Sequence, residues 1–225
     1  MTVHRARDSG RRSLGFRKWW RSRGAACALV VGGLLMTLLF VPFTITHGPT
    51  SFNEERTLLG LDMHFWGLLL GVAPNVLIAA GFWTLGRRVA GSNRLAIAAR
   101  TTICAVLLMS AAADLAFRAL GPPFGLLLLA PAAVVACVSA APKDAANARA
   151  RVVIGVLAAV LMTGCILALI PAQTSDSFSG YRVFGVLVYA TAGILWALLG
   201  LMLYAPEGSE DEPLAAEASG TDRDG

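Results

Sequence analysis

Charged residues are missing from five long stretches of the sequence. Only 15% of the 225 residues are charged, and 56% are hydrophobic. The uncharged stretches are 24–53, 63–86, 119–142, 152–175 and 183–206. A soluble domain of this size needs charge on its surface helices and loops, so the composition excludes that class. Because about 20 apolar residues cross a ~30 Å hydrocarbon core, the sequence predicts a polytopic membrane protein.

Motifs for enzymatic chemistry are also missing. The three histidines, His4, His47 and His64, lie outside the predicted hydrocarbon core, so neither an intramembrane Ser/His pair nor a histidine metal site is predicted. No Gly-x-x-x-x-Gly-Lys-Ser/Thr loop occurs, so any ATPase would be a separate chain. No two cysteines form a Cys-x-x-Cys pair, and we interpret all four as packing residues. We expect no metal and no cofactor.

The apolar runs predict an all-α fold, a polytopic bundle of six transmembrane helices. The spans are expected at about 25–45, 66–86, 99–120, 122–141, 152–171 and 183–204. Asp114 and Arg118 interrupt the third span. Without that span the chain would cross five times and its ends would lie on opposite sides of the membrane.

The distribution of basic residues favours six spans. With the N-terminus in the cytoplasm, sixteen of the 19 Lys and Arg residues fall on the cytoplasmic side, and three fall outside. This is the bias of the positive-inside rule. We therefore predict a multi-pass protein of the cell membrane (plasma or inner) with both termini cytoplasmic. The same bias explains the basic pI, so nucleic-acid binding is not expected.

Three segments outside the spans differ in character. Residues 1–24 form a basic arm, and its aromatic and cationic residues from 14 to 21 predict an interfacial helix that anchors the chain or docks a partner. Residues 205–225 carry seven acids and predict a disordered cytoplasmic tail. In the outer loop at 46–65, a Ser51–Glu54 capping box followed by leucines from 58 to 61 predicts a short amphipathic helix.

Small residues recur at a spacing of four along several spans, which favours close helix packing. They are Gly67 and Gly71; Ala132, Ala136 and Ala140; Gly155, Ala159 and Thr163; Gly193 and Ala197. The pattern predicts a closely packed bundle. Self-association into a homo-oligomer stays an alternative.

Five residues are candidates for a functional site. Asp114 and Arg118 have the i,i+4 spacing of a helical ion pair, and Asp114 is alternatively a proton or cation site. Pro74 and Pro131 lie near the middle of the second and fourth spans, where proline frees a carbonyl one turn back. Such breaks occur in transporter helices and also in ordinary kinks. Asn75, beside the first break, is placed to bond a freed carbonyl or a substrate.

These features favour transport as the function: a small permease or transporter subunit that moves a small molecule or lipid. Substrate- or ion-binding candidates are Asn75, Asp114 and Arg118, with Thr37, Ser110 and Thr163 as lesser polar groups. The partners expected are the lipid bilayer and a cytoplasmic ATPase or another membrane subunit. A non-transporting membrane scaffold or assembly factor is the alternative, and a lipid-modifying membrane enzyme is third.

Overall fold

The computed structural model describes residues 23–40, 57–58, 60–62, 65–66, 68–117, 124–140, 145–168 and 185–204. In these residues the chain is almost entirely helical, which confirms the all-α class. The α-helices are α2 (Ala25–Leu35), α5 (Ala73–Ala90), α6 (Arg94–Phe117), α7 (Phe124–Ser139), α8 (Ala145–Ala168) and α10 (Thr191–Leu203). Residues 1–22 of the arm, the tail, the third–fourth connection and Arg118 lie outside the described residues.

Two of the described helices are long and apolar enough to cross a membrane, at Arg94–Ala113 and Asn147–Ile166. Three others are apolar but shorter: Ala25–Leu38, Leu128–Ser139 and Leu187–Leu203. Length and composition in the described residues thus establish two candidate spans, where the sequence alone predicted six.

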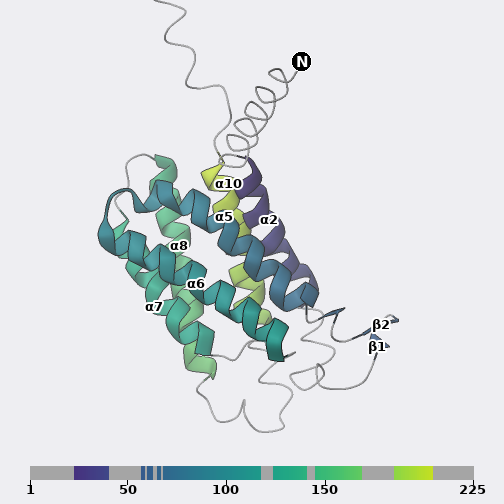
Figure 1. The fold of residues 1–225 in the computed structure, drawn as a ribbon. Helices are drawn as coiled ribbons and strands as arrows, with labels where there is room; N and C mark the ends of the chain where they lie inside the picture. Colours follow the sequence, from purple (N-terminus) through teal and green to yellow (C-terminus); the bar gives the residue numbers. More distant parts are fainter. Residues whose placement is uncertain are drawn as a thin grey trace, which may run out of the picture.

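In the part of the chain that the structure describes, the six α-helices pack in a closed ring. Each packs against its neighbour in the chain, from α2 through α5, α6, α7 and α8 to α10, and α10 returns to pack against α2 (Figure 1). Because successive helices alternate in direction, neighbours in the ring are antiparallel. Inside the ring α5 also contacts α8 and α10. The rings of Phe82 and Trp196 meet there edge to face, with centroids 5.3 Å apart.

The closure between α2 and α10 depends on glycine. A Cβ added to Gly33 would press on the carbonyl oxygen of Gly193 and lie 2.8 Å from the backbone nitrogen of Ala197. Absence of a side chain therefore lets the two backbones touch. The predicted small-residue contact at Gly193 and Ala197 is confirmed, whereas Ala159 and Thr163 on α8 are exposed, so that part of the prediction is wrong.

Side chains from neighbouring segments bond the carbonyls near two helix C-termini. Arg88 donates to the carbonyl oxygen of Leu203 at 3.0 Å, at the end of α10. On α7, Asn93 Nδ2 donates to Ser139 O at 2.8 Å and Arg151 Nε to Cys137 O at 2.7 Å. The last carbonyls of a helix have no intrahelical donor, so these bonds satisfy groups that are otherwise unpaired.

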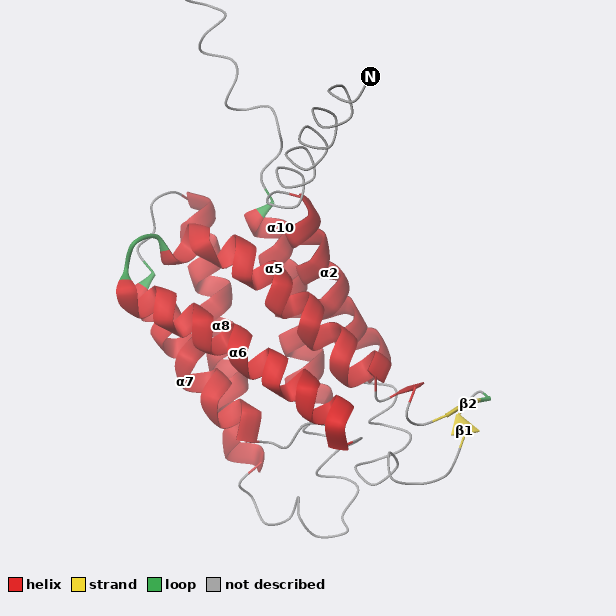
Figure 2. Cartoon of the chain, in the orientation of Figure 1, coloured by secondary structure: helices red, strands yellow, loops and turns green. Residues whose placement is uncertain are grey.

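The outer loop differs from its prediction. In place of the amphipathic helix expected over residues 58–61, Thr57–Leu58 (β1) pairs antiparallel with Leu61–Asp62 (β2), as Figure 2 shows in yellow. Gly60 has φ 76°, a conformation that glycine adopts readily and that reverses the chain. A hairpin therefore replaces the helix at these positions.

Three predicted spans change their winding along their length. π-helical segments occur at Met36–Phe40 (η2), Leu68–Val72 (η4) and Gly185–Ala190 (η6), next to α2, α5 and α10. η2 contacts both of the other segments, so the three irregular turns meet in one part of the bundle. Single π-helical turns inside α-helices are frequent at functional sites.

Candidate functional site

Pro74 and Asn75 lie where η4 gives way to α5. Pro74 is buried in the first turn of α5, a position where a missing N–H is tolerated. The side chain of Asn75 donates from Nδ2 to the carbonyl oxygen of Gly71 at 2.7 Å. The amide predicted to bond a freed carbonyl or a substrate therefore bonds the backbone of its own segment, one turn back.

Of Pro131, Asp114 and Arg118, the structure describes the side chain of Pro131 alone. Pro131 lies inside α7 on an exposed face, unlike the buried Pro74. Asp114 belongs to the last turn of α6, but the described part of the chain includes neither its side chain nor Arg118. The predicted ion pair therefore stays a prediction.

The lesser polar candidates mostly bond helix backbone. Thr37 donates from Oγ1 toward Gly33 O at 3.1 Å and Ala190 O at 3.2 Å, which joins η2 to η6. Thr163 is exposed on α8 and donates to Ala159 O at 2.9 Å. Thr37 thus helps to hold the irregular turns together, while Thr163 faces away from the bundle.

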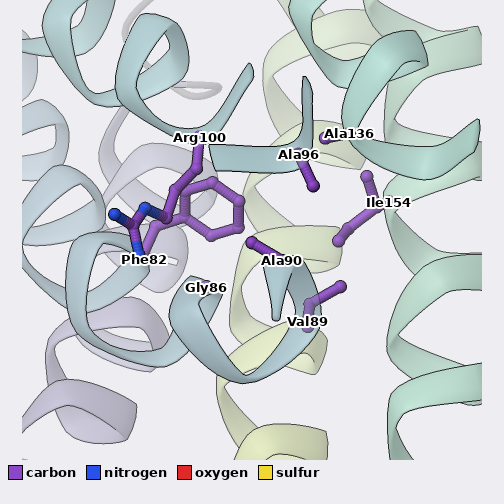
Figure 3. A pocket seen from close by; sticks show the side chains of 8 residues that line it. All are labelled: Phe82, Gly86, Val89, Ala90, Ala96, Arg100, Ala136 and Ile154. Carbon is purple, nitrogen blue, oxygen red and sulfur yellow. The ribbon is translucent and has the colours of Figure 1, made fainter. Parts of the chain in front are cut away.

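A buried arginine was missed by the sequence analysis. Arg100 is only 7% exposed, although the sequence analysis counted it only among the basic residues of the cytoplasmic side. Its stem passes beside Gly86 of α5: a Cβ added to Gly86 would lie 3.1 Å from Arg100 Cδ. Figure 3 shows the side chain running from α6 alongside Phe82, with the guanidinium pointing away from Ala96 and Ile154.

The guanidinium of Arg100 stacks on Trp83. Its central carbon lies 4.5 Å from the ring centroid, and that of Arg87 lies 5.8 Å from the same centroid. Both distances are within the range of cation–π attraction. The Nε of Arg100 is buried and has no hydrogen-bond partner. The sequence held one signal for this site, since Trp83 and Arg87 are spaced i,i+4 on one helix.

Two cavities adjoin this cluster. The inner one has about 10 Å³, close to the space that one water molecule needs. It is lined by Phe82, Gly86, Val89, Ala90, Ala96, Arg100, Ala136 and Ile154. The outer one is an open groove of about 450 Å³ between α5 and α6. It is lined by Val76, Ala79, Ala80, Trp83, Thr101, Cys104, Ala105 and Leu108.

Chemically, this arrangement is suited to binding an anion. In the described ranges, no group of three or more His, Cys, Asp or Glu side chains could hold a metal. The acidic residues in those ranges are Asp62 and Asp114 alone, against two arginines on the single ring of Trp83. We name this group of Trp83, Arg87 and Arg100, together with the outer groove, the α5–α6 site.

Comparison of the chain with protein-family models, with curated proteins and with solved structures finds no match.

Proposed function

We propose that the chain is a multi-pass protein of the cell membrane with six spans and both termini in the cytoplasm. Its two long apolar helices support this location. Two further spans become long enough when the π-helical turns are included. The stretch 68–90 joins η4 to α5 and is about 34 Å long, and 185–203 joins η6 to α10 and is about 28 Å long.

The described arginines support the proposed orientation. They are Arg23, Arg87, Arg88, Arg94, Arg100, Arg149 and Arg151. They belong to the start of α2, the end of α5 and the starts of α6 and α8, which lie at one end of the alternating bundle (Figure 1). By the positive-inside rule that end faces the cytoplasm.

A labelling experiment tests this topology. Ser92→Cys in the α5–α6 turn should be protected from an impermeant thiol reagent in intact cells, and Ser177→Cys in the last outer loop should be labelled. Both variants are made in a chain whose four native cysteines are replaced by alanine. Labelling of the cysteine at position 92 would contradict the proposed six-span topology, because the arginine-rich end of the bundle would then face outward.

Within that membrane location, we propose that the chain is a transporter subunit that moves a small molecule or lipid, together with a separate ATPase. The meeting of η2, η4 and η6 is the observation that carries this proposal. Interrupted helices that meet in one part of a bundle are how membrane transporters expose backbone groups to a substrate. Thr37 in η2 and Asn75 just after η4 are polar side chains that bond the backbone of these turns.

A membrane scaffold is the second candidate. It is favoured by the bond from Asn75 to Gly71, which satisfies the amide inside its own segment. The direct backbone contact between Gly33 and Gly193 also favours it, because helices packed this closely resist relative movement.

Alanine variants of the two prolines separate these functions. The readouts are flux of a fluorescent phospholipid in proteoliposomes and ATPase activity co-purifying from native membranes. In a transporter, Pro74→Ala should reduce both readouts while thermal stability holds or rises. Pro131→Ala is the matched control, since its proline is exposed. Absence of both readouts from the unaltered chain would assign the protein to the scaffold class.

A further inference from the structure

We propose that the α5–α6 site binds an anionic phospholipid of the cytoplasmic leaflet. Arg87 and Arg100 hold the phosphate beside Trp83, and an acyl chain lies along the outer groove. This inference rests on the membrane location proposed above and names a lipid ligand for one face of the bundle.

The first argument is charge. Arg87 and Arg100 both approach the ring of Trp83, so two positive charges gather at one side chain. Asp114, the one acid on α6, is fourteen residues from Arg100, about 21 Å along the helix. At that distance it cannot serve as a counterion inside the site. An anion bound beside the ring would offset these positive charges.

The second argument is burial. A guanidinium that has left water is stabilised by a bidentate anion such as phosphate, which matches its planar set of donors. Only 7% of the surface of Arg100 is exposed, and its Nε has no hydrogen-bond partner. Stacking on Trp83 gives the flat face of the guanidinium a favourable contact, but it gives the N–H donors no hydrogen-bond acceptor. A phosphate would supply the acceptor that Nε lacks.

The third argument is depth. Arg100 lies about 9 Å along α6 from Arg94, and Trp83 about 10 Å along α5 from Ala90. These helix ends belong to the arginine-rich end of the bundle, so the site falls close to the lipid headgroups. Tryptophan and arginine are both favoured at that level, and basic pockets between helices on the cytoplasmic side bind anionic headgroups.

The fourth argument is the groove that continues from Trp83. It runs between α5 and α6 from Trp83 and Thr101 toward Val76 and Leu108, and its lining is almost entirely apolar. All outward surfaces of a membrane bundle are apolar, so a groove alone identifies no ligand. Here the groove begins at Trp83, whose ring Arg87 and Arg100 approach, so a phosphate attached to an acyl chain fits both parts. A soluble phosphate fits one part only.

Lipid selectivity tests the proposal. The full-length chain, purified in detergent, is mixed with equal amounts of phosphatidylglycerol and phosphatidylcholine, and bound lipid is counted by native mass spectrometry. The unaltered chain should prefer phosphatidylglycerol. Since one cation near the lipid surface contributes about 1 kcal/mol, Arg100→Gln should reduce the preference about fivefold and Arg87→Gln/Arg100→Gln about thirtyfold.

Two controls distinguish a lipid site from general charge. Arg94→Gln/Arg149→Gln removes the same charge from exposed positions outside the site and should leave the preference unchanged. Glycerol 3-phosphate carries the anion without an acyl chain and should fail to displace the lipid. Equal binding of both phospholipids, displacement by glycerol 3-phosphate, or full preference in the Arg87→Gln/Arg100→Gln variant would overturn the proposal.

A substitution in the outer groove tests the proposal even if the loss of Arg100 prevents the chain from folding. Ala105 is exposed and lines the groove, so Ala105→Phe should fill it while leaving both arginines in place. Bound phosphatidylglycerol should then fall severalfold, and unchanged binding would refute an acyl chain in the groove. Correct labelling at position 92 together with absent lipid preference would reject this inference alone, whereas labelling from outside would reject the proposed membrane topology.

Discussion

Replacement of Gly33 by alanine tests the closure of the helix ring. The added methyl group would press on the carbonyl oxygen of Gly193 and lie 2.8 Å from the nitrogen of Ala197. Both are backbone atoms, which cannot rotate aside, so α2 and α10 must separate. Such overpacking costs about 1–3 kcal/mol, while alanine gains about 1 kcal/mol over glycine in a helix. With about 3 kcal/mol for overpacking, we expect the Gly33→Ala variant to lose about 2 kcal/mol of its free energy of unfolding.

Gly155→Ala is the matched control, because it adds the same methyl group on α8. Its Cβ would meet only the sulfur of Cys137, at 3.1 Å, and a thiol is the end of a movable side chain. We expect its stability to stay within about 1 kcal/mol of the unaltered chain. Unfolding by sodium dodecyl sulfate in mixed micelles, followed by tryptophan fluorescence, measures both. Equal stability of the Gly33→Ala variant and the unaltered chain would refute direct backbone contact.

Three further predictions concern single residues. Arg88→Gln removes the donor to Leu203 O and should lower stability in the same titration by about 1 kcal/mol; no change would show that the bond is unimportant. Asp114→Asn should lower stability modestly if Arg118 is its partner, and Asp114→Asn/Arg118→Gln should recover much of it; no recovery would exclude the pair. Pro131→Ala restores a backbone donor inside α7 and should leave the thermal midpoint unchanged or raised, so a lower midpoint would assign the proline a packing role.

The existence of the helices followed from the sequence because uncharged apolar runs have few stable arrangements. Even α6 forms across Asp114, the residue that made the third span the least regular of the six. The hairpin at Gly60 did not follow, because the pattern of leucines around it fits a helix equally well. A single glycine at positive φ decided the outcome.

Arg100 shows why the α5–α6 site was missed. We placed the start of the third span at residue 99 from hydropathy, whereas α6 begins at Arg94. A helix continues past the apolar run that identifies it, and an arginine near its end can lay its apolar stem against a neighbour. Whether a neighbour offers space is a tertiary property. Here Gly86 and Trp83 offer it, and both belong to a different helix.

The π-helical turns also could not be predicted from local sequence. Thr37 bonds the carbonyl of Ala190, which follows it by 153 positions, so the turn at η2 depends on a partner from the last helix. Asn75 bonds the carbonyl of Gly71, only four residues back, whereas the prediction concerned a substrate or the carbonyl that Pro74 frees. Residue spacing in the sequence can suggest a hydrogen bond within one helical turn, but it cannot suggest one between distant segments.

The position of α10 has a consequence for synthesis of the chain. Gly33 of α2 meets Gly193 of α10, and 160 positions separate them. At about 5–20 residues per second, the first helix waits roughly 8–30 s for its final neighbour. During that interval the glycine face of α2 is open to other helices in the same membrane. A chaperone or insertase that shields this face until α10 emerges would prevent incorrect pairing, and loss of α10 by truncation would leave it permanently uncovered.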